Sequence, residues 1–207
     1  MKKIVTLLGD FYHPHDQLVD YFQGIVKKFP QELEMTDLTI DQLRKILQEQ
    51  PDIFLLSKEN RLAPETDQAV WLDETYDQLI TEYVANGGSL IAHHSGLSNY
   101  PIHSTFHDML GGRFIHHPKP TEVVYRDQKG LSYKIWDEHY FTEVDQAKTE
   151  VRLHSYSQSG ESIAAWRHQY GKGSVFCITP AHFSEGLQHK ATEKLLLEGI
   201  DWCLKPM

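Results

Sequence analysis

The stretch Asn86-Gly87-Gly88-Ser89-Leu90-Ile91-Ala92-His93-His94-Ser95-Gly96 decides the fold. Asn-Gly-Gly is a strong signal for the end of a helix, and apolar periodicity indicates a long helix directly before it, over residues 65–85. Residues 89–93 form a compact apolar run with the length of a buried strand. The stretch therefore predicts a helix, a tight turn and a buried strand that ends in two histidines.

The same alternation of strand and helix extends toward the N-terminus. Apolar patterns predict strands over residues 3–8, 33–38 and 52–57, and helices over residues 15–29 and 41–49. Asp41 is well placed as the N-cap of the second of these helices. Four buried strands alternating with helices predict an α/β fold with a mostly parallel, doubly wound sheet and helices on both faces.

The second half of the chain is less regular. Residues 162–166 and 174–179 flank Tyr170-Gly171-Lys172-Gly173, which predicts a late β-hairpin, and residues 191–204 predict a closing amphipathic helix. The sequence has no internal repeat, low-complexity tract or linker. One domain over residues 1–207 is therefore the simplest expectation.

Composition narrows the class of partner. The 207 residues are 40% hydrophobic and 24% charged with a formal net charge of -9, which excludes a disordered or fibrous chain and argues against nucleic acid or anionic lipid as a partner. A small molecule is favoured. The apolar run near Met1 is too short for a signal sequence or a membrane span, so we expect a cytoplasmic protein. Cys177 and Cys203 form neither a disulfide framework nor a metal-binding spacing and are interpreted as buried apolar residues.

Histidine is the unusual residue, with 13 copies. Ligands of an open parallel sheet bind beyond the carboxyl ends of its strands. The polar residues that follow the predicted strands are His13 and His15, then Lys58 and Arg61, then His93, His94 and Ser95, and finally His182. Because these ends share one edge, we expect the side chains to surround one crevice, where neutral imidazole serves as a metal ligand or an acid/base group.

Structural interpretations stay open for several histidines. His13, His15, His116 and His117 can each be structural only. His103 and His107 are spaced to share a helix face as metal ligands, but Pro101 precedes them and no glutamate completes an HExxH motif, so a solvated face is the simpler interpretation. Gly9-Asp10 lacks the further glycines of a dinucleotide fingerprint, which argues against a nucleotide cofactor.

Ordered motifs in the second half resemble a known family. They are Asn86 to Gly96, Leu110-Gly111-Gly112-Arg113-Phe114 with His117-Pro118, Asp137-Glu138-His139-Tyr140, Ala165-Trp166-Arg167, Tyr170 to Phe176, Ala181-His182 and Leu195 to Trp202. Through these motifs taken together, the chain resembles the trehalose-utilisation (ThuA-like) family of the class I glutamine amidotransferase-like superfamily. The resemblance implies a flavodoxin-like, three-layer α/β/α fold and a role in carbohydrate metabolism.

The resemblance also assigns site residues by position. His94 matches the family's histidine at the end of the fourth strand, His182 the late histidine, Glu138 the acidic residue of an Asp-Glu pair, and His13 an early histidine. His93 stands where the family usually has an apolar residue. Amidotransferase relatives carry a nucleophilic cysteine at the strand-to-helix turn, a position that His94 occupies here, so we expect no glutaminase activity.

These observations lead to two expectations of function. The first is an enzyme of isomerase or hydrolase type, acting on a sugar or ketosugar derivative. His94 and His182 would act as acid/base groups or bind a divalent metal such as zinc, with Glu138 as carboxylate partner and His13 as a third nitrogen ligand. Ser95, His93, Arg61 and Tyr140 are the candidate substrate contacts. The second is a non-catalytic sugar-binding or assembly module on a fold that has lost its nucleophile; either could form a homo-oligomer.

Overall fold

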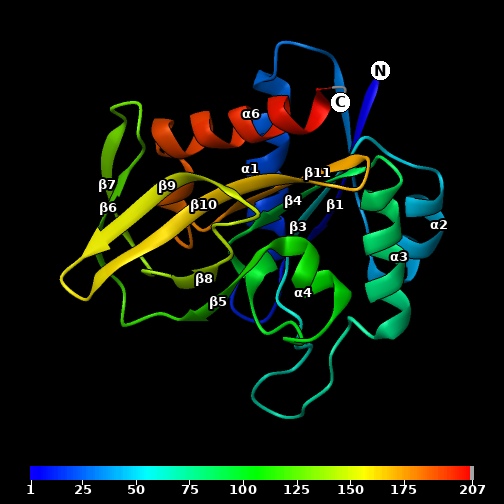
Figure 1. Cartoon of the computed structure of the whole chain (residues 1–207), viewed down its shortest axis with the longest axis horizontal. Coiled ribbons are helices and arrows are strands. Elements are labelled where there is room, and N and C mark those ends of the chain that lie inside the picture. The colour runs from blue at the N-terminus through cyan, green and yellow to red at the C-terminus, as the bar shows by residue number, and fades with distance from the viewer. Residues whose placement is uncertain (206–207) are drawn as a thin grey trace.

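A nine-stranded sheet lies at the centre of the computed structural model, which describes residues 1–205 (Figure 1). Its strand order is β2-β1-β3-β4-β11-β10-β9-β6-β7, and β5 and β8 form a separate two-stranded sheet. The strands are β1 (Lys2–Leu8), β2 (Leu33–Asp37), β3 (Ile53–Ser57), β4 (Ser89–His93), β5 (Gly112–His116), β6 (Thr121–Arg126), β7 (Ser132–Asp137), β8 (Phe141–Val144), β9 (Glu150–Ser157), β10 (Gly160–Tyr170) and β11 (Gly173–Ile178).

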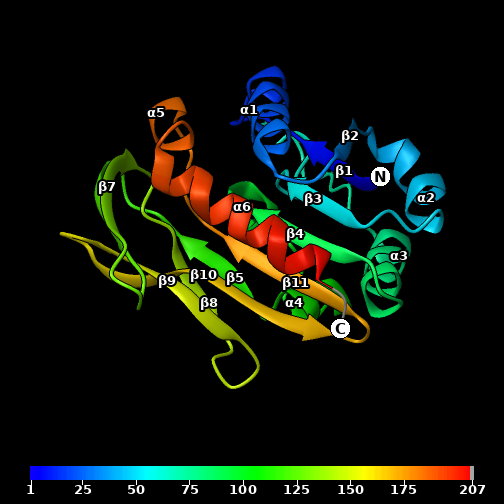
Figure 2. The same ribbon diagram turned by 90° about the horizontal axis from the view of Figure 1, so that it is seen from above.

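Helices cover both faces of the sheet, as Figure 2 shows for α1 and α6 on one side and α3 and α4 on the other. The helices are α1 (His15–Lys28), α2 (Ile40–Gln48), α3 (Glu74–Ala85), the 3₁₀ turn η1 (His94–Leu97), α4 (Thr105–Leu110), α5 (Ser184–Leu187) and α6 (Lys190–Leu204). Successive side chains of β3 point to opposite faces of the sheet, which explains the two layers. Leu55 packs in the core with α1 and α6, and Leu56 packs in the core with α2 and α3. The predicted α/β class is confirmed.

The parallel strands end at one level. In the parallel pair β1 and β3, Leu8 lies beside Ser57, and in the parallel pair β4 and β11, His93 lies beside Ile178. The loops after these strands therefore converge at one edge of the sheet.

The second half adds an antiparallel extension that is larger than the predicted hairpin. The hairpin itself is confirmed, because β10 and β11 pair antiparallel from Tyr170 and Gly173 outward. Beyond it β9, β6 and β7 continue the sheet in antiparallel order, so the sheet is mixed. Glu138 is carried by the loop after β7, the last strand of this extension.

Two predicted helix starts are wrong. The helix expected over residues 65–85 begins only at Glu74, because the Asp73 carboxylate accepts hydrogen bonds from the backbone N–H groups of Thr75 and Tyr76 and caps it there. The preceding residues form a loop with one isolated bridge to Arg61. The second helix begins at Ile40, with Thr39 and not Asp41 at its N-cap.

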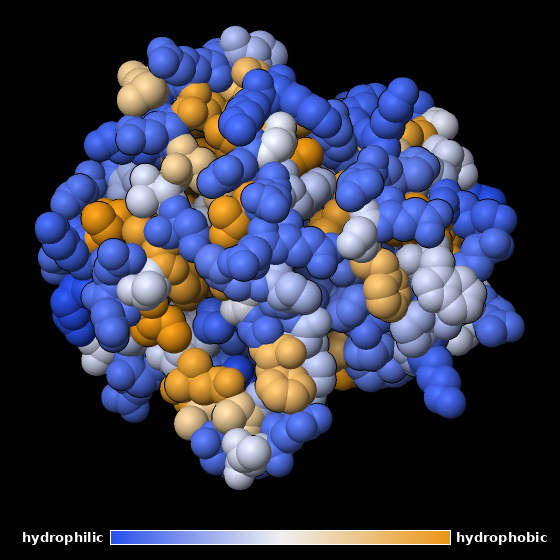
Figure 3. All heavy atoms as spheres, turned by 180° about the vertical axis from the view of Figure 1, so that it is seen from behind, coloured by the Kyte–Doolittle hydropathy of each residue, from blue (hydrophilic) through white to orange (hydrophobic). Residues whose placement is uncertain are grey.

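The surface facing away from the view of Figure 1 is mostly hydrophilic, with hydrophobic residues in separate patches (Figure 3). Among residues 1–205, no helix has the length and apolar character needed to cross a membrane. Cys177 and Cys203 are both buried, as expected.

Candidate functional site

A cavity of about 390 Å³ opens at the carboxyl edge of the parallel strands. Its walls come from the loops after β1, β3, β4, β7 and β11 and from β5. The lining residues are Tyr12, His13, Glu59, Arg61, Ser95, Ser98, Asn99, Phe114, His117, Glu138, Tyr140 and His182. Segments far apart in the chain thus supply polar and aromatic side chains to one small space.

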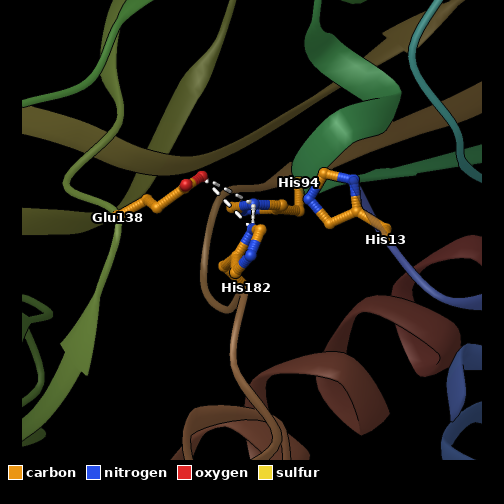
Figure 4. A group of neighbouring side chains, drawn as sticks. All are labelled: His13, His94, Glu138 and His182. Atoms are coloured by element: carbon orange, nitrogen blue, oxygen red, sulfur yellow. Dashed lines mark hydrogen bonds and ion pairs between the residues drawn. The ribbon is translucent and has the colours of Figure 1, made fainter. Parts of the chain in front are cut away.

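Three histidines and one carboxylate meet beside this cavity (Figure 4). One ligand atom from each of His13, His94, Glu138 and His182 lies within 4.8 Å of the others. Glu138 Oε2 lies 3.3 Å from His182 Nδ1 and 3.6 Å from His94 Nε2. Imidazole nitrogen and carboxylate oxygen are the ligands that zinc and related transition metals prefer, so this group could hold a metal ion.

His94 stands at a sharp turn between β4 and η1. Its φ of 47° lies in the left-handed region, which costs energy for a residue with a Cβ and is found mostly where function requires it. Its Nδ1 lies 2.7 Å from the Thr179 carbonyl oxygen, which can only accept a hydrogen bond. Nδ1 therefore carries the proton, and Nε2 presents a lone pair toward Glu138 and His182.

His13 is oriented by Asp10. Its Nδ1 lies 2.6 Å from Asp10 Oδ1, so the ring donates from Nδ1 to the carboxylate, and Nε2 is the atom turned toward the cluster. The Asp10 carboxylate also accepts the backbone N–H groups of Tyr12 and Glu59. Burial opposes the ionisation of Asp10, but these hydrogen bonds and His13 outweigh it and lower its pKa to about 2.

Asp137 supports the other side of the group. It ends β7 fully buried, and its carboxylate accepts the backbone N–H of His182 at 2.8 Å and the hydroxyl of Tyr125 at 2.9 Å. Burial raises the pKa of Asp137 to about 7. The contact ties the loop after β11 to the end of β7, so His182 and Glu138 are placed by one shared hydrogen bond.

The charges of the group are unevenly distributed. Complete burial lowers the pKa of His94 to about 4, so this imidazole is neutral at pH 7. Burial alone would lower the pKa of His182, but the Glu138 carboxylate overcomes it and raises this pKa. Glu138 is likewise partly buried, yet His182 and His94 hold its pKa well below the usual range. Without a cation, Glu138 is therefore ionised.

Comparison with known proteins identifies the family. A sequence model of the ThuA family, described as trehalose utilisation, matches residues 12–203. The chain belongs to the ThuA family. No curated protein matches it.

Solved structures share the ThuA-family fold at low identity. A ThuA-like protein from Parabacteroides merdae is 13% identical with a TM-score of 0.76, covering 99% of this chain and 90% of its own. A second, from Bacteroides uniformis, is 16% identical with a TM-score of 0.71, covering 98% and 91%. A β-galactosidase from Rahnella sp. R3 is 10% identical with a TM-score of 0.67, but the match covers 32% of that longer chain.

In this ThuA-family chain, most of the candidate substrate contacts lie at the cavity. Ser95, Arg61 and Tyr140 line it, and the Tyr140 ring stacks on His94 at 4.2 Å between centroids. His93 does not reach it. The His93 ring is buried on the other side of β4, where Nδ1 pairs with Ser57 Oγ at 2.9 Å and the ring packs against Phe22.

The remaining histidines separate into two groups. His117 lines the cavity, with Nε2 3.7 Å from Glu138 Oε2. His15 instead pairs with Asp16 and Asp37, and His116 stacks on Phe141. His103 precedes the N-cap of α4, so it shares no helix face with His107.

Sequence reasoning missed four polar residues of this ThuA-family site. They are Asp10, Glu59, Asn99 and Asp137. Asp10 directly follows a predicted strand, so the rule that drew attention to His13 could have found it. Glu59 lies in a polar loop whose pattern is typical of solvated residues, and nothing in that pattern indicates its burial.

Proposed function

We propose that the chain is an enzyme of isomerase or hydrolase type that acts on a sugar or ketosugar derivative at the cavity beside His94. The observation that carries this proposal is the convergence of His13, His94, Glu138 and His182 within 4.8 Å. Membership of a family described as trehalose utilisation supports a sugar as the substrate class.

The donor set fits a divalent metal such as zinc. His94 and His13 each give their Nδ1 hydrogen to a fixed oxygen, from Thr179 and Asp10, and turn a lone pair toward Glu138 and His182. Metal-binding histidines are oriented in this way in known sites. A divalent cation bound there polarises a carbonyl or hydroxyl oxygen of the sugar and lowers the pKa of a bound water.

The other lining side chains position the substrate in this proposal. Tyr140 and Phe114 give the cavity an apolar wall, and Ser95 and Arg61 give it hydrogen-bonding groups. His117 lines the cavity with Nε2 3.7 Å from Glu138 Oε2, where it can exchange a proton with a sugar hydroxyl. Acid/base exchange beside a carbonyl is what an isomerisation of a ketosugar requires.

The test is elemental analysis of protein purified without a histidine tag or chelator. We expect about one transition metal per chain, lost in both His94→Ala and His182→Ala. His154→Ala on β9 is the matched control, and should keep the metal. A metal-free wild type, or metal retained in both variants, would contradict the ligand assignment.

Turnover is measured next, on trehalose and on keto derivatives of disaccharides. We expect conversion that His94→Ala abolishes. Binding of a sugar without conversion would instead favour the non-catalytic module. We expect no release of glutamate from glutamine, because His94 holds the position of the amidotransferase nucleophile and Cys177 and Cys203 are buried elsewhere.

A further inference from the structure

A buried carboxylate, that of Glu59, belongs to the lining of the cavity. Glu59 follows β3 and is only 2% exposed, although it is an acidic residue. Its Oε2 accepts three hydrogen bonds, from Arg61 Nε at 3.1 Å, Arg61 Nη2 at 2.8 Å and Asn99 Nδ2 at 2.5 Å. These contacts hold the carboxylate in one orientation.

The second carboxylate oxygen of Glu59 takes no part in these hydrogen bonds. Oε1 is buried and has no hydrogen-bond partner among residues 1–205. An unpaired buried carboxylate oxygen is costly, so such an atom on a residue that lines a cavity is a candidate to accept a hydrogen bond from a bound ligand. The hydroxyl-bearing residues Ser95 and Ser98 line the same cavity and can share in that contact.

The charge at Glu59 favours one class of ligand group as the hydrogen-bond donor. Arg61 is the one arginine or lysine among the described lining residues, and its charge is already matched by Glu59. A phosphate or carboxylate at this wall would meet the Glu59 carboxylate, and no arginine or lysine of the described lining is left unpaired to offset it. A neutral hydroxyl group meets no such penalty.

Another part of the cavity lining is aromatic. Phe114 lies 4.3 Å from Tyr140 between ring centroids, and His117 is stacked with Tyr140 at 5.7 Å. A cavity with one aromatic wall and one hydrogen-bonding wall matches a sugar ring, which has C–H faces and an edge of hydroxyl groups. The volume of about 390 Å³ is within the range of small-ligand sites.

We propose that Glu59 is a specificity-determining residue, which accepts a hydroxyl hydrogen of an unphosphorylated sugar ring through Oε1 and excludes sugar phosphates and sugar acids. Arg61 and Asn99 are positioning residues for this carboxylate. The inference rests on the proposed function for one point, that the ligand is a sugar lying between this wall and the histidines.

Isothermal titration of the full chain with glucose, trehalose, glucose 6-phosphate and glucuronate tests the proposal. We expect the wild type to bind a neutral sugar at least 10-fold more tightly than either anionic one. Glu59→Gln should weaken the binding of the neutral sugar by about 10-fold or more. It should also reduce the difference in affinity between the neutral sugar and glucose 6-phosphate, since Arg61 is then unpaired. Glu65→Gln, on the exposed part of the same loop, is the matched control and should change neither.

Arg61→Gln keeps the test decisive if Glu59→Gln does not fold. Arg61 is partly exposed, and removing its charge should widen the discrimination against the anionic sugars. If Arg61 were instead an anion-binding residue, this variant would lose glucose 6-phosphate binding that the wild type has. A wild type that binds anionic sugars as tightly as neutral ones, or binds neither neutral sugar, overturns the proposal.

Metal content of the same samples separates this proposal from the previous one. Glu59→Gln should retain the metal, because the Glu59 carboxylate is bonded to Arg61 and Asn99 and to none of the four clustered side chains. Neutral-sugar selectivity in a metal-free protein would leave the Glu59 assignment standing and contradict the metal. Bound metal in a protein that does not select neutral sugars would contradict the Glu59 assignment and leave the metal site standing.

Discussion

Asp10 fixes the orientation of His13 through a single short hydrogen bond. Its side chain is fully buried and also accepts two backbone N–H groups, so the carboxylate has no freedom to follow a displaced imidazole. A carboxylate in this position sets the tautomer of a metal-binding histidine and raises its basicity.

We expect Asp10→Asn to weaken metal binding by 10- to 100-fold, because the amide oxygen accepts more weakly from His13 and carries no charge. Affinity is measured by competition with a chelating dye. Unchanged affinity in a variant that melts like the wild type would show that Asp10 does not support the site.

At the same scale, the sequence predicted the imidazoles better than the carboxylates. His13, His94 and His182 follow strands whose ends share one edge, and simple topology brings them together. Glu138 follows an antiparallel strand that no periodicity placed there. The dense polar cluster from Asp137 to Tyr140 left a surface loop as the simpler interpretation, and the family resemblance was what assigned Glu138 to the site. The burial of Glu59 depends on Arg61 and Asn99, and Asn99 is 40 residues away, a pairing that one sequence does not contain.

Among the elements, η1 is the one on which the site geometry depends most. The turn packs directly on β3, and a Cβ added at Gly96 would overlap the backbone carbonyl oxygen of Leu56. Neither backbone segment has free space to move into, since the residues of η1 and of β3 are all buried.

Gly96→Ala is therefore expected to destabilise the protein by about 1–3 kcal/mol through overpacking and to displace His94. Chemical denaturation gives the first quantity, and metal content the second. Gly24→Ala on α1 is the control, because a Cβ there meets open space. If Gly96→Ala keeps both full stability and the metal, the turn tolerates more movement than its packing indicates.

The elements that sequence patterns predicted best are the buried ones. β3, β4 and α6 are found within two residues of their expected bounds, because continuous apolar runs and helical periodicity follow directly from burial. The segment before α3 differed because Trp71 continues the near-helical spacing of Tyr76 and Tyr83 toward the N-terminus, although the Asp73 cap starts the helix only after it. The helix start at this position is therefore set by the Asp73 cap and not by the apolar periodicity.

The whole molecule has two apolar layers separated by one sheet. Leu195 on α6 belongs to one layer and Ile80 on α3 to the other, and both are almost fully buried. The two side chains share no packing layer, so their contributions to stability should be independent unless the sheet transmits strain between them.

We expect Leu195→Ala and Ile80→Ala each to lower the free energy of unfolding by about 2–5 kcal/mol, and the double variant to lower it by their sum within about 0.5 kcal/mol. Both should shift one shared transition, followed by far- and near-ultraviolet circular dichroism. Two separate transitions would mean that the layers unfold independently.

The spacing of the four clustered residues along the chain has a consequence for synthesis. During synthesis His182 leaves the ribosome long after His13, because most of the sequence shown lies between them. Long-range pairings of this kind form late, because the connecting segments must first be ordered. In refolding with a metal-sensitive dye present, we expect the dye to report uptake of the ion only after most secondary structure has returned. Capture of the ion would then mark the completion of the sheet rather than its start.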